Sequence, residues 1–141
     1  MILKKKLERV VLIDDDESTN FLHERLITRK ACTEDIAVFQ SAEKALDYLH
    51  VKQPVEADSP VLIFLDINMP RMDGWDFLER YRSSKDIARP NHVVIMLTTS
   101  LNPDDRTRAG TYKEVAGFYS KPLTPEILDE VLHEHFGAEK E

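Results

Sequence analysis

The residues most capable of chemistry in this chain directly follow short apolar runs. Asp14 and Asp15 follow the run VVLI, and Asp66 follows VLIFL. Thr98 follows VVIML, and Lys121 stands two residues after the run GFY. In an open parallel sheet, ligands bind beyond the carboxyl ends of the strands, and three aspartates converging there repel one another strongly. Mg²⁺ would relieve that repulsion, because it prefers oxygen ligands and keeps several waters.

These groups could together carry out a covalent phosphoryl transfer. Asp66 is the candidate nucleophile, because a carboxylate can attack a phosphoryl donor when a metal and a cation neutralise the developing charge. We expect Asp15 to bind Mg²⁺ directly and Asp14 to bind it through a water. Asp66 and the backbone carbonyl of Asn68 would complete the protein ligands. Lys121 is expected to pair with the phosphoryl group as a point charge.

Thr98 is the candidate switch residue. Its hydroxyl can hydrogen-bond a phosphoryl oxygen once that group is bound, which moves the loop after the fourth apolar run. The movement would open space for an aromatic side chain, and Phe118 is placed to respond. The sequence therefore predicts a conformational switch beside the acceptor site.

Five apolar runs alternate with amphipathic stretches, which predicts a parallel sheet covered by helices on both faces. The predicted strands are residues 10–13, 36–39, 61–65, 93–97 and 117–119. The expected fold is α/β, a doubly wound five-stranded parallel sheet of strand order 2-1-3-4-5 and flavodoxin-like type. If the strands take that order, the first and third strands are neighbours, and Asp14, Asp15 and Asp66 converge.

Apolar residues at helical spacing predict which helix faces pack on the sheet. The predicted core stripes are Phe21, Leu22, Leu26 and Ile27; Ala42, Ala45, Leu46 and Leu49; Trp75, Phe77, Leu78 and Tyr81; and Ile127, Leu128, Val131 and Leu132. Asn102 and Thr124 are predicted helix caps, because each precedes a proline that suits a first helical turn. Residues 1–141 are expected to form one domain with a core of about 8–136.

Composition limits the classes of partner. The formal net charge of −7 disfavours nonspecific binding to nucleic acid or anionic lipid. No apolar run approaches the roughly 18 residues of a membrane span, and the first run is too short for a secretion signal. The single cysteine, Cys32, cannot form an internal disulfide and is expected to be buried. We therefore expect a cytoplasmic protein whose partners are proteins.

Four motifs, in order, resemble those of the receiver domains of two-component response regulators, and the resemblance spans essentially the whole chain. The motifs are VVLIDDDES, LDINMPRMDGWDFL, IMLTTS and FYSKP. The resemblance implies a five-stranded receiver fold and assigns a role to each matching position. The implied residues are the phosphoacceptor Asp66, the acidic pair Asp14 and Asp15, the switch residues Thr98 and Phe118, and Lys121.

The resemblance also implies partners and a mode of action. The phosphoryl donor would be a sensor histidine kinase or a phosphotransfer protein, with Mg²⁺ as cofactor. The chain resembles the single-domain members, which act by binding a downstream protein, and a homodimer through the fourth and fifth helices is a family-based expectation. No enzymatic activity is expected beyond the chain's own phosphoryl transfer and autodephosphorylation.

Several positions depart from the commonest family pattern or, in the family, affect dephosphorylation. Thr99 stands where many members carry alanine or glycine, and it is expected to slow access of the donor or of water to the phosphoryl group. Asn68 and Ser100 flank the site and, in the family, tune dephosphorylation. The stretch RAGTYKEVAGF lacks the usual compact glycine-alanine turn, so this surface is the expected interface with a particular partner.

Other interpretations use the same residues. A hydrolytic phosphatase would also use Asp66, but it needs a second acid at the position of Asn68. A flavin module would need a phosphate-binding loop where this chain has an acidic run. A phosphorylation-independent interaction module would keep the fold without the switch. Zinc binding by His133 and His135 is disfavoured, because residues two apart point to different faces of a helix.

Overall fold

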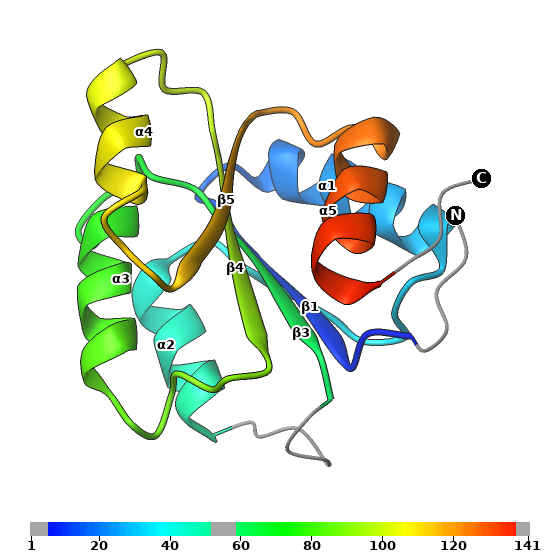
Figure 1. Cartoon of the computed structure of the whole chain (residues 1–141), viewed down its shortest axis with the longest axis horizontal. Helices are drawn as coiled ribbons and strands as arrows, with labels where there is room; N and C mark the ends of the chain where they lie inside the picture. The colour runs from blue at the N-terminus through cyan, green and yellow to red at the C-terminus, as the bar shows by residue number, and fades with distance from the viewer. Residues whose placement is uncertain (1–5, 52–58, 138–141) are drawn as a thin grey trace.

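Strands and helices alternate along the whole of the chain that the computed structural model describes, which is residues 6–51 and 59–137 (Figure 1). The strands are β1 (Arg9–Ile13), β2 (Ile36–Phe39), β3 (Val61–Leu65), β4 (His92–Thr98) and β5 (Val115–Ser120). The helices are α1 (Glu17–Lys30), α2 (Ala42–Val51), α3 (Gly74–Ser83), α4 (Pro103–Ala109) and α5 (Pro125–Phe136). All strand pairs are parallel, in the order β2-β1-β3-β4-β5. The predicted doubly wound fold is confirmed.

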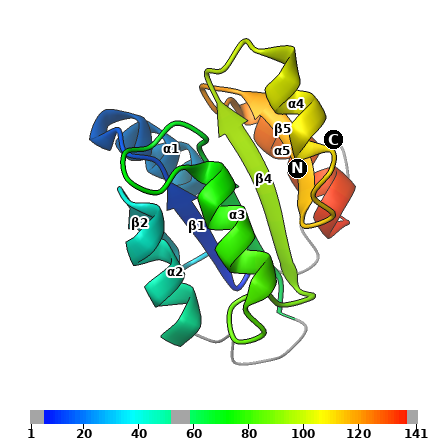
Figure 2. The ribbon, with the colours of Figure 1, turned by 90° about the vertical axis from the view of Figure 1, so that its left-hand side faces the viewer.

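Helices cover both faces of the sheet, with α1 and α5 on one side and α2, α3 and α4 on the other (Figures 1 and 2). Each layer has its own buried apolar cluster. One cluster includes Ile27 of α1 and Leu128 of α5, and the other includes Leu46 of α2 and Phe77 of α3. Cys32 is buried in the first of these clusters, as predicted. Both faces of the sheet are therefore enclosed by apolar contacts.

The strand register sets which residues emerge together at the carboxyl edge of the sheet. β1 and β3 are buried along their whole length and pair so that Ile13 lies opposite Leu65. Leu65 in turn lies opposite Met96 of β4. Because parallel strands end at the same edge, the residues that follow β1 and β3, Asp14 and Asp66, leave the sheet side by side.

Helix caps lie three or four residues after the ends of β1, β4 and β5. The side chain of Asn102 accepts a hydrogen bond from the N–H of Asp104 at 3.0 Å, and that of Thr124 accepts one from Ile127 at 3.1 Å. Both predicted caps are confirmed, each with proline in the first turn of the helix. Asp16 caps α1 in the same way, so each of these helices begins within a few residues of the site edge.

The predicted apolar stripe of α1 is correct for Ile27, which is buried, and for Leu26, which packs against the core, but it is wrong for Phe21 and Leu22. Phe21 and Leu22 are 56% and 62% exposed, whereas Asn20, His23 and Ile27 are buried. The buried residues recur at three- and four-residue intervals and so share one face of the helix. Asn20 and His23 are polar, and hydrophobicity alone therefore selected Phe21 and Leu22, whose side chains are exposed.

A half-buried imidazole at the opposite end of the sheet from the aspartates makes stability sensitive to acid. The hydroxyl of Tyr81 lies 2.9 Å from Nδ1 of His92, and burial, with the charges of Arg89 and Arg9, lowers the pKa of His92 from 6.5 to about 4. Between those values the unfolded state binds more protons, so stability falls as pH drops through this window, by about 3 kcal/mol at its lower end.

Denaturant unfolding at pH 7 and pH 4.5 measures this loss. We expect His92→Gln to lose clearly less stability than wild type over this interval, whereas His50→Gln, which changes an exposed imidazole, should lose as much as wild type. Equal losses in all three proteins would show that His92 does not cause the dependence.

Candidate functional site

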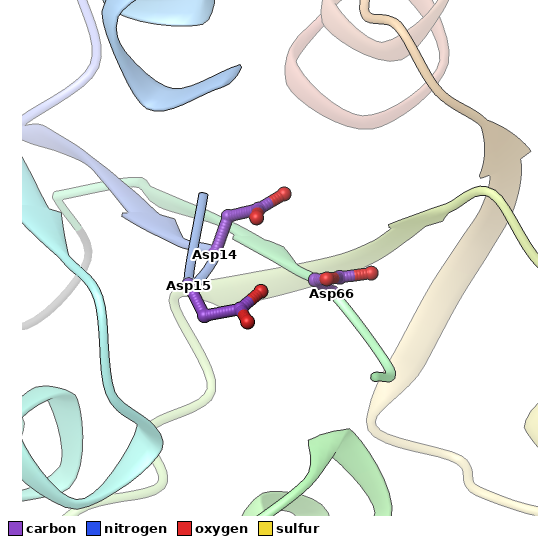
Figure 3. Close-up of side chains that lie close together, drawn as sticks. All are labelled: Asp14, Asp15 and Asp66. Carbon is purple, nitrogen blue, oxygen red and sulfur yellow. The ribbon is translucent and has the colours of Figure 1, made fainter. Parts of the chain in front are cut away.

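Three carboxylates meet at the carboxyl edge of the sheet (Figure 3). Asp14 and Asp15 leave the end of β1, Asp66 leaves the end of β3, and one oxygen of each lies within 4.8 Å of the others. Asp14 and Asp66 are each 5% exposed, whereas Asp15 is exposed. Two of the three carboxylates are therefore buried, and solvent reaches the cluster at Asp15.

Lys121 adds a positive charge to this cluster. Its Nζ lies 2.7 Å from Oδ2 of Asp14 and 3.4 Å from Oδ2 of Asp66. Burial acts to lower the pKa of Lys121, but the hydrogen bond to Asp14 and the charges of Asp66 and Asp14 outweigh it and raise that pKa. One ammonium group thus contacts two of the three carboxylates, which leaves an excess of negative charge.

Burial and the excess of negative charge make the ionised form of Asp66 unfavourable. Burial and the nearby charge of Asp14 raise the pKa of Asp66, and Lys121 opposes them together with the hydrogen bond that the N–H of Ile67 donates at 2.9 Å. The ionised carboxylate is therefore kept at an energetic cost. Any added positive charge in the cluster is favoured by the same electrostatics.

Asp14 is held in one orientation. Its Oδ1 accepts a hydrogen bond from the N–H of Asp16 at 2.9 Å, and its Oδ2 is the one that Lys121 contacts. Its backbone oxygen accepts a hydrogen bond from Nδ2 of Asn20 at 2.7 Å. Because each of these three oxygens accepts a hydrogen bond, the side chain and backbone of Asp14 are held in a fixed position in the site.

Gly74 supports the backbone of Asp66, a role that sequence reasoning missed. The N–H of Gly74 donates to the carbonyl of Ile67 at 2.8 Å, and a Cβ at Gly74 would lie 2.5 Å from the carbonyl oxygen of Asp66. Asp73 and Asp76 form a reciprocal capping box that starts α3 at this point. A glycine straight after a capping aspartate was the available signal, and only glycine fits there.

The two predicted switch residues lie on one face of the sheet. Phe118 pairs with Met96, two residues before Thr98, so the side chains of Thr98 and Phe118 point the same way. Thr98 is fully buried, and its hydroxyl oxygen accepts from the N–H of Ser100 at 3.2 Å. Phe118 is half-buried, with the guanidinium of Arg106 from α4 at 4.8 Å from its ring centre.

The remaining predicted residues lie around the cluster or away from it. Asn68 is exposed two residues after Asp66, and Thr99 is exposed just after β4. His133 and His135 lie on α5, and the only set of three or more ligand-bearing side chains found within the described residues is the aspartate cluster. The acidic site is therefore the candidate metal centre.

Asn20 and His23 of α1 also reach this region, and sequence reasoning did not find them. Both line a small cavity together with Asp14 and Asp66. Polar residues on a helix between two apolar runs are expected to face solvent, so the sequence carried no signal for the burial of Asn20 and His23.

The part of the chain that the structure describes contains no helix both long and apolar enough to cross a membrane.

Comparison with known proteins agrees with the fold and the cluster. The sequence model of the family described as "Response regulator receiver domain" matches residues 10–133. The "Probable methanogenesis regulatory protein FilR2" of Methanothrix harundinacea is 30% identical over 126 residues, which is 89% of this chain and 79% of that protein. A "Protein-glutamate methylesterase/protein-glutamine glutaminase 2" of Xanthomonas oryzae is 29% identical over 81% of this chain, but only 29% of its own length is matched.

Solved structures show the same architecture. A two component response regulator from Cytophaga hutchinsonii superposes with a TM-score of 0.81 at 28% identity, covering 94% of this chain and 99% of that chain. A response regulator receiver protein from Dyadobacter fermentans gives a TM-score of 0.79 at 26% identity, with 91% and 97% covered.

The fold, the acidic cluster and these matches define a signalling module of two-component systems. The chain belongs to the response regulator receiver domain family. Receiver domains are mostly non-enzymatic, bind Mg²⁺ at an acidic pocket, and interact with histidine kinases or phosphotransfer proteins and with downstream targets. In enzymes such as the methylesterase above, the matched segment is a minor part of the protein.

Proposed function

We propose that this receiver accepts a phosphoryl group on Asp66, in a reaction that requires Mg²⁺, and that the modification changes its affinity for a protein partner. The donor is a sensor histidine kinase or a phosphotransfer protein. The observation that carries the proposal is the meeting of Asp14, Asp15 and Asp66 within 4.8 Å, with the Lys121 ammonium against two of them. This is the charge arrangement that attack of a carboxylate on a phosphoryl group needs.

The donor set fits a hard divalent cation. Its ligands are all oxygens, two buried and one exposed, and one ammonium leaves their negative charge only partly compensated. Asp15, Asp14 and Asp66 would hold Mg²⁺, with the carbonyl of Asn68 as a further ligand. Bound there, the ion supplies neutralisation of the charge on the phosphoryl oxygens.

The transfer itself uses the carboxylate of Asp66. One of its oxygens forms the new bond to phosphorus while the bond from phosphorus to the donor's imidazole nitrogen breaks. The electron pair of that bond stays on the nitrogen, which leaves as a neutral imidazole because the phosphorylated ring already carries one proton. Lys121 remains charged and pairs with the phosphoryl oxygens that arrive between it and Asp66.

The switch follows from the place of Thr98 and Phe118. The buried hydroxyl of Thr98 turns to donate to a phosphoryl oxygen, which draws the segment through Ser100 toward the site. Phe118 lies on the same face of the sheet and moves inward, away from the guanidinium of Arg106. Because Arg106 belongs to α4, the surface of that helix changes as well.

The partner surface is proposed from the same elements. The segment after α4 is held on α3 by the buried ring of Tyr112, which stacks on that of Trp75 at 5.9 Å, and the exposed Arg108 lies 4.5 Å from the Trp75 ring centre. A downstream protein would bind this face, and the alternative is that a second copy of the chain binds through α4 and α5 to form a homodimer. We further propose that the chain works as one receiver module in the cytoplasm, without nucleic acid or membrane, and that it catalyses only its own phosphorylation and dephosphorylation.

Intact-mass measurement tests the phosphoacceptor proposal directly. Wild type is incubated with acetyl phosphate, with and without Mg²⁺. A single phosphoryl adduct that depends on Mg²⁺ and is stable in acid but labile in base is the expected result. Absence of an adduct, also with a phosphotransfer protein as donor, would instead support a phosphorylation-independent interaction module.

Lys121→Ala separates metal binding from switching. Lys121 is not a proposed ligand, so the variant should bind Mg²⁺ at least as tightly as wild type, since a repelling charge is removed. It should fail to show the shift in the Phe118 ring signals that phosphorylation causes in wild type. Calorimetry and NMR measure the two effects, and Lys113→Ala, at an exposed lysine, serves as control. Loss of Mg²⁺ binding in Lys121→Ala would contradict the assigned role.

A further inference from the structure

The inner face of α1 carries two buried polar side chains that the proposed chemistry does not use. Asn20 is 3% exposed and His23 is 4% exposed. They stand three residues apart, so they lie on the same face of the helix, directed at the sheet. Burying polar groups in such an interface is costly unless they form hydrogen bonds, so their partners are informative.

Each of the two side chains bonds to the backbone of a segment that carries a charged site residue. Nδ2 of Asn20 donates to the carbonyl oxygen of Asp14 at 2.7 Å. Nε2 of His23 accepts from the N–H of Leu123 at 3.1 Å, two residues after Lys121. These segments follow β1 and β5, which are separated in the sheet by β3 and β4. Helix α1 therefore links two strand ends that the sheet itself does not join.

Lys121 needs such support because β5 is an edge strand. Within the residues that the structure describes, β5 pairs only with β4, and the last hydrogen bond on that side runs from the N–H of Lys121 to the carbonyl of Thr98 at 2.9 Å. On its other side, the chain is next held by the bond from Leu123 to His23. The 2.7 Å contact from Lys121 to Asp14 thus lies between two backbone anchors, one from β4 and one from α1.

We propose that His23 and Asn20 are positioning residues for phosphoryl transfer, His23 by holding the segment that carries Lys121 and Asn20 by holding Asp14. This inference rests on the proposed function. Burial lowers the pKa of His23, and the charge of Lys121 adds to this effect while Asp14 opposes it. At neutral pH the ring is therefore uncharged and keeps Nε2 available as an acceptor.

Removal of the acceptor has a defined local consequence. In His23→Leu the N–H of Leu123, a residue only 6% exposed, loses its partner while the volume of the side chain is nearly kept. The segment must then move to find another acceptor, because a buried unpaired N–H is unfavourable. Lys121 moves with it, and its ammonium no longer faces Asp14 and Asp66 at the distances observed.

The experiment uses the full chain and four variants. His23→Leu removes the acceptor, His23→Gln restores one, and Asn20→Ala removes only the bond to Asp14. Ile27→Val, at a fully buried position on the same face of α1, is the control for weakened packing. Three quantities are measured for each: hydrogen exchange of the Leu123 amide by NMR, the dissociation constant for Mg²⁺, and the initial rate of labelling by acetyl phosphate.

We expect His23→Leu to speed exchange of the Leu123 amide and to slow labelling, each by roughly tenfold, with Mg²⁺ affinity within about twofold of wild type. His23→Gln should recover most of both losses. Asn20→Ala should slow labelling but leave exchange at Leu123 unchanged, and Ile27→Val should alter none of the three quantities by more than about twofold.

Two results would overturn the inference. One is a His23→Leu variant that labels, and exchanges at Leu123, as the Ile27→Val control does. The other is a parallel loss of Mg²⁺ affinity and labelling, which would place the effect of His23 on the metal ligands. If wild type itself is not labelled, the proposed function fails, and exchange at Leu123 still decides whether His23 holds the segment.

Discussion

Asp66→Asn should abolish phosphoryl labelling by acetyl phosphate under all conditions in which wild type is labelled. The amide has no anionic oxygen with which to attack phosphorus, and the neighbouring carboxylate of Asp14 is engaged by Lys121 at 2.7 Å and by the N–H of Asp16. Asp15 is exposed and offers no comparable contact with the lysine. Intact mass after incubation with Mg²⁺ and the donor gives the result.

A matched control for this variant is Asp47→Asn, which changes an exposed carboxylate on α2. It should be labelled like wild type. A persistent adduct on Asp66→Asn, mapped by peptide mass spectrometry to Asp14 or Asp15, would show that the acceptor is misassigned. Labelling that fails in both variants would point to a general effect of removing acidic charge.

The same substitution should also make the fold more stable at pH 7. Burial and Asp14 raise the pKa of Asp66, so between its ordinary and its folded value the folded state binds more protons than the unfolded state. Stability contributed by this group is therefore present at low pH and lost as pH rises through the raised pKa. Asp66→Asn removes that loss, and denaturant unfolding at pH 7 without Mg²⁺ should give a higher midpoint than wild type.

Gly74→Ala should be the most damaging of the small substitutions near the site. A methyl group there would lie 2.5 Å from the carbonyl oxygen of Asp66 and 2.9 Å from Cα of Ile67, and both are backbone atoms that cannot rotate away. Alanine normally favours a helix over glycine by about 1 kcal/mol. Here the clash should outweigh that gain and give a net loss of roughly 2 kcal/mol. It should also slow labelling, because the backbone of Asp66 must move.

Gly110→Ala provides the comparison. Gly110 ends α4 with φ −64° and ψ −16°, and its nearest foreign atom to a new Cβ is the Thr107 carbonyl oxygen at 3.3 Å. Its effect on stability should be well below that of Gly74→Ala, and labelling should be unchanged. Thermal or denaturant unfolding measures both variants. Equal, small effects would show that the β3–α3 connection yields more easily than the contact distances indicate.

The parallel strands and the acidic residues at their ends could be predicted because their signals are local and repeated, whereas the strand order entered only as a hypothesis under which the aspartates converge. Each central strand is a continuous apolar run, which only a strand buried on both faces requires. Parallel strands all end at one edge, so the residues that follow Ile13 and Leu65 had to meet there. Proline after Asn102 and Thr124 marked two helix starts for an equally local reason.

The burial of Asn20 and His23 on α1 could not be predicted, because it depends on partners outside the helix. Asn20 and His23 can be buried because both form hydrogen bonds there: Asn20 donates to the carbonyl of Asp14, and His23 accepts from the N–H of Leu123. Leu123 is 100 residues away from His23 in sequence. Without those partners the apolar Phe21 and Leu22 would be the better residues to bury, which is why hydrophobicity alone selected these two positions.

The sequence by itself determined the class of fold, the edge of the sheet at which chemistry can occur, and the residue types gathered there. Apolar periodicity and strand-end residues are local properties that one sheet topology combines. Only the tertiary structure decided how the groups are held: the two contacts of Lys121, the close approach of Gly74 to Asp66, and the support from α1. These depend on distances between segments far apart in the chain, which become defined when the helices pack on the sheet.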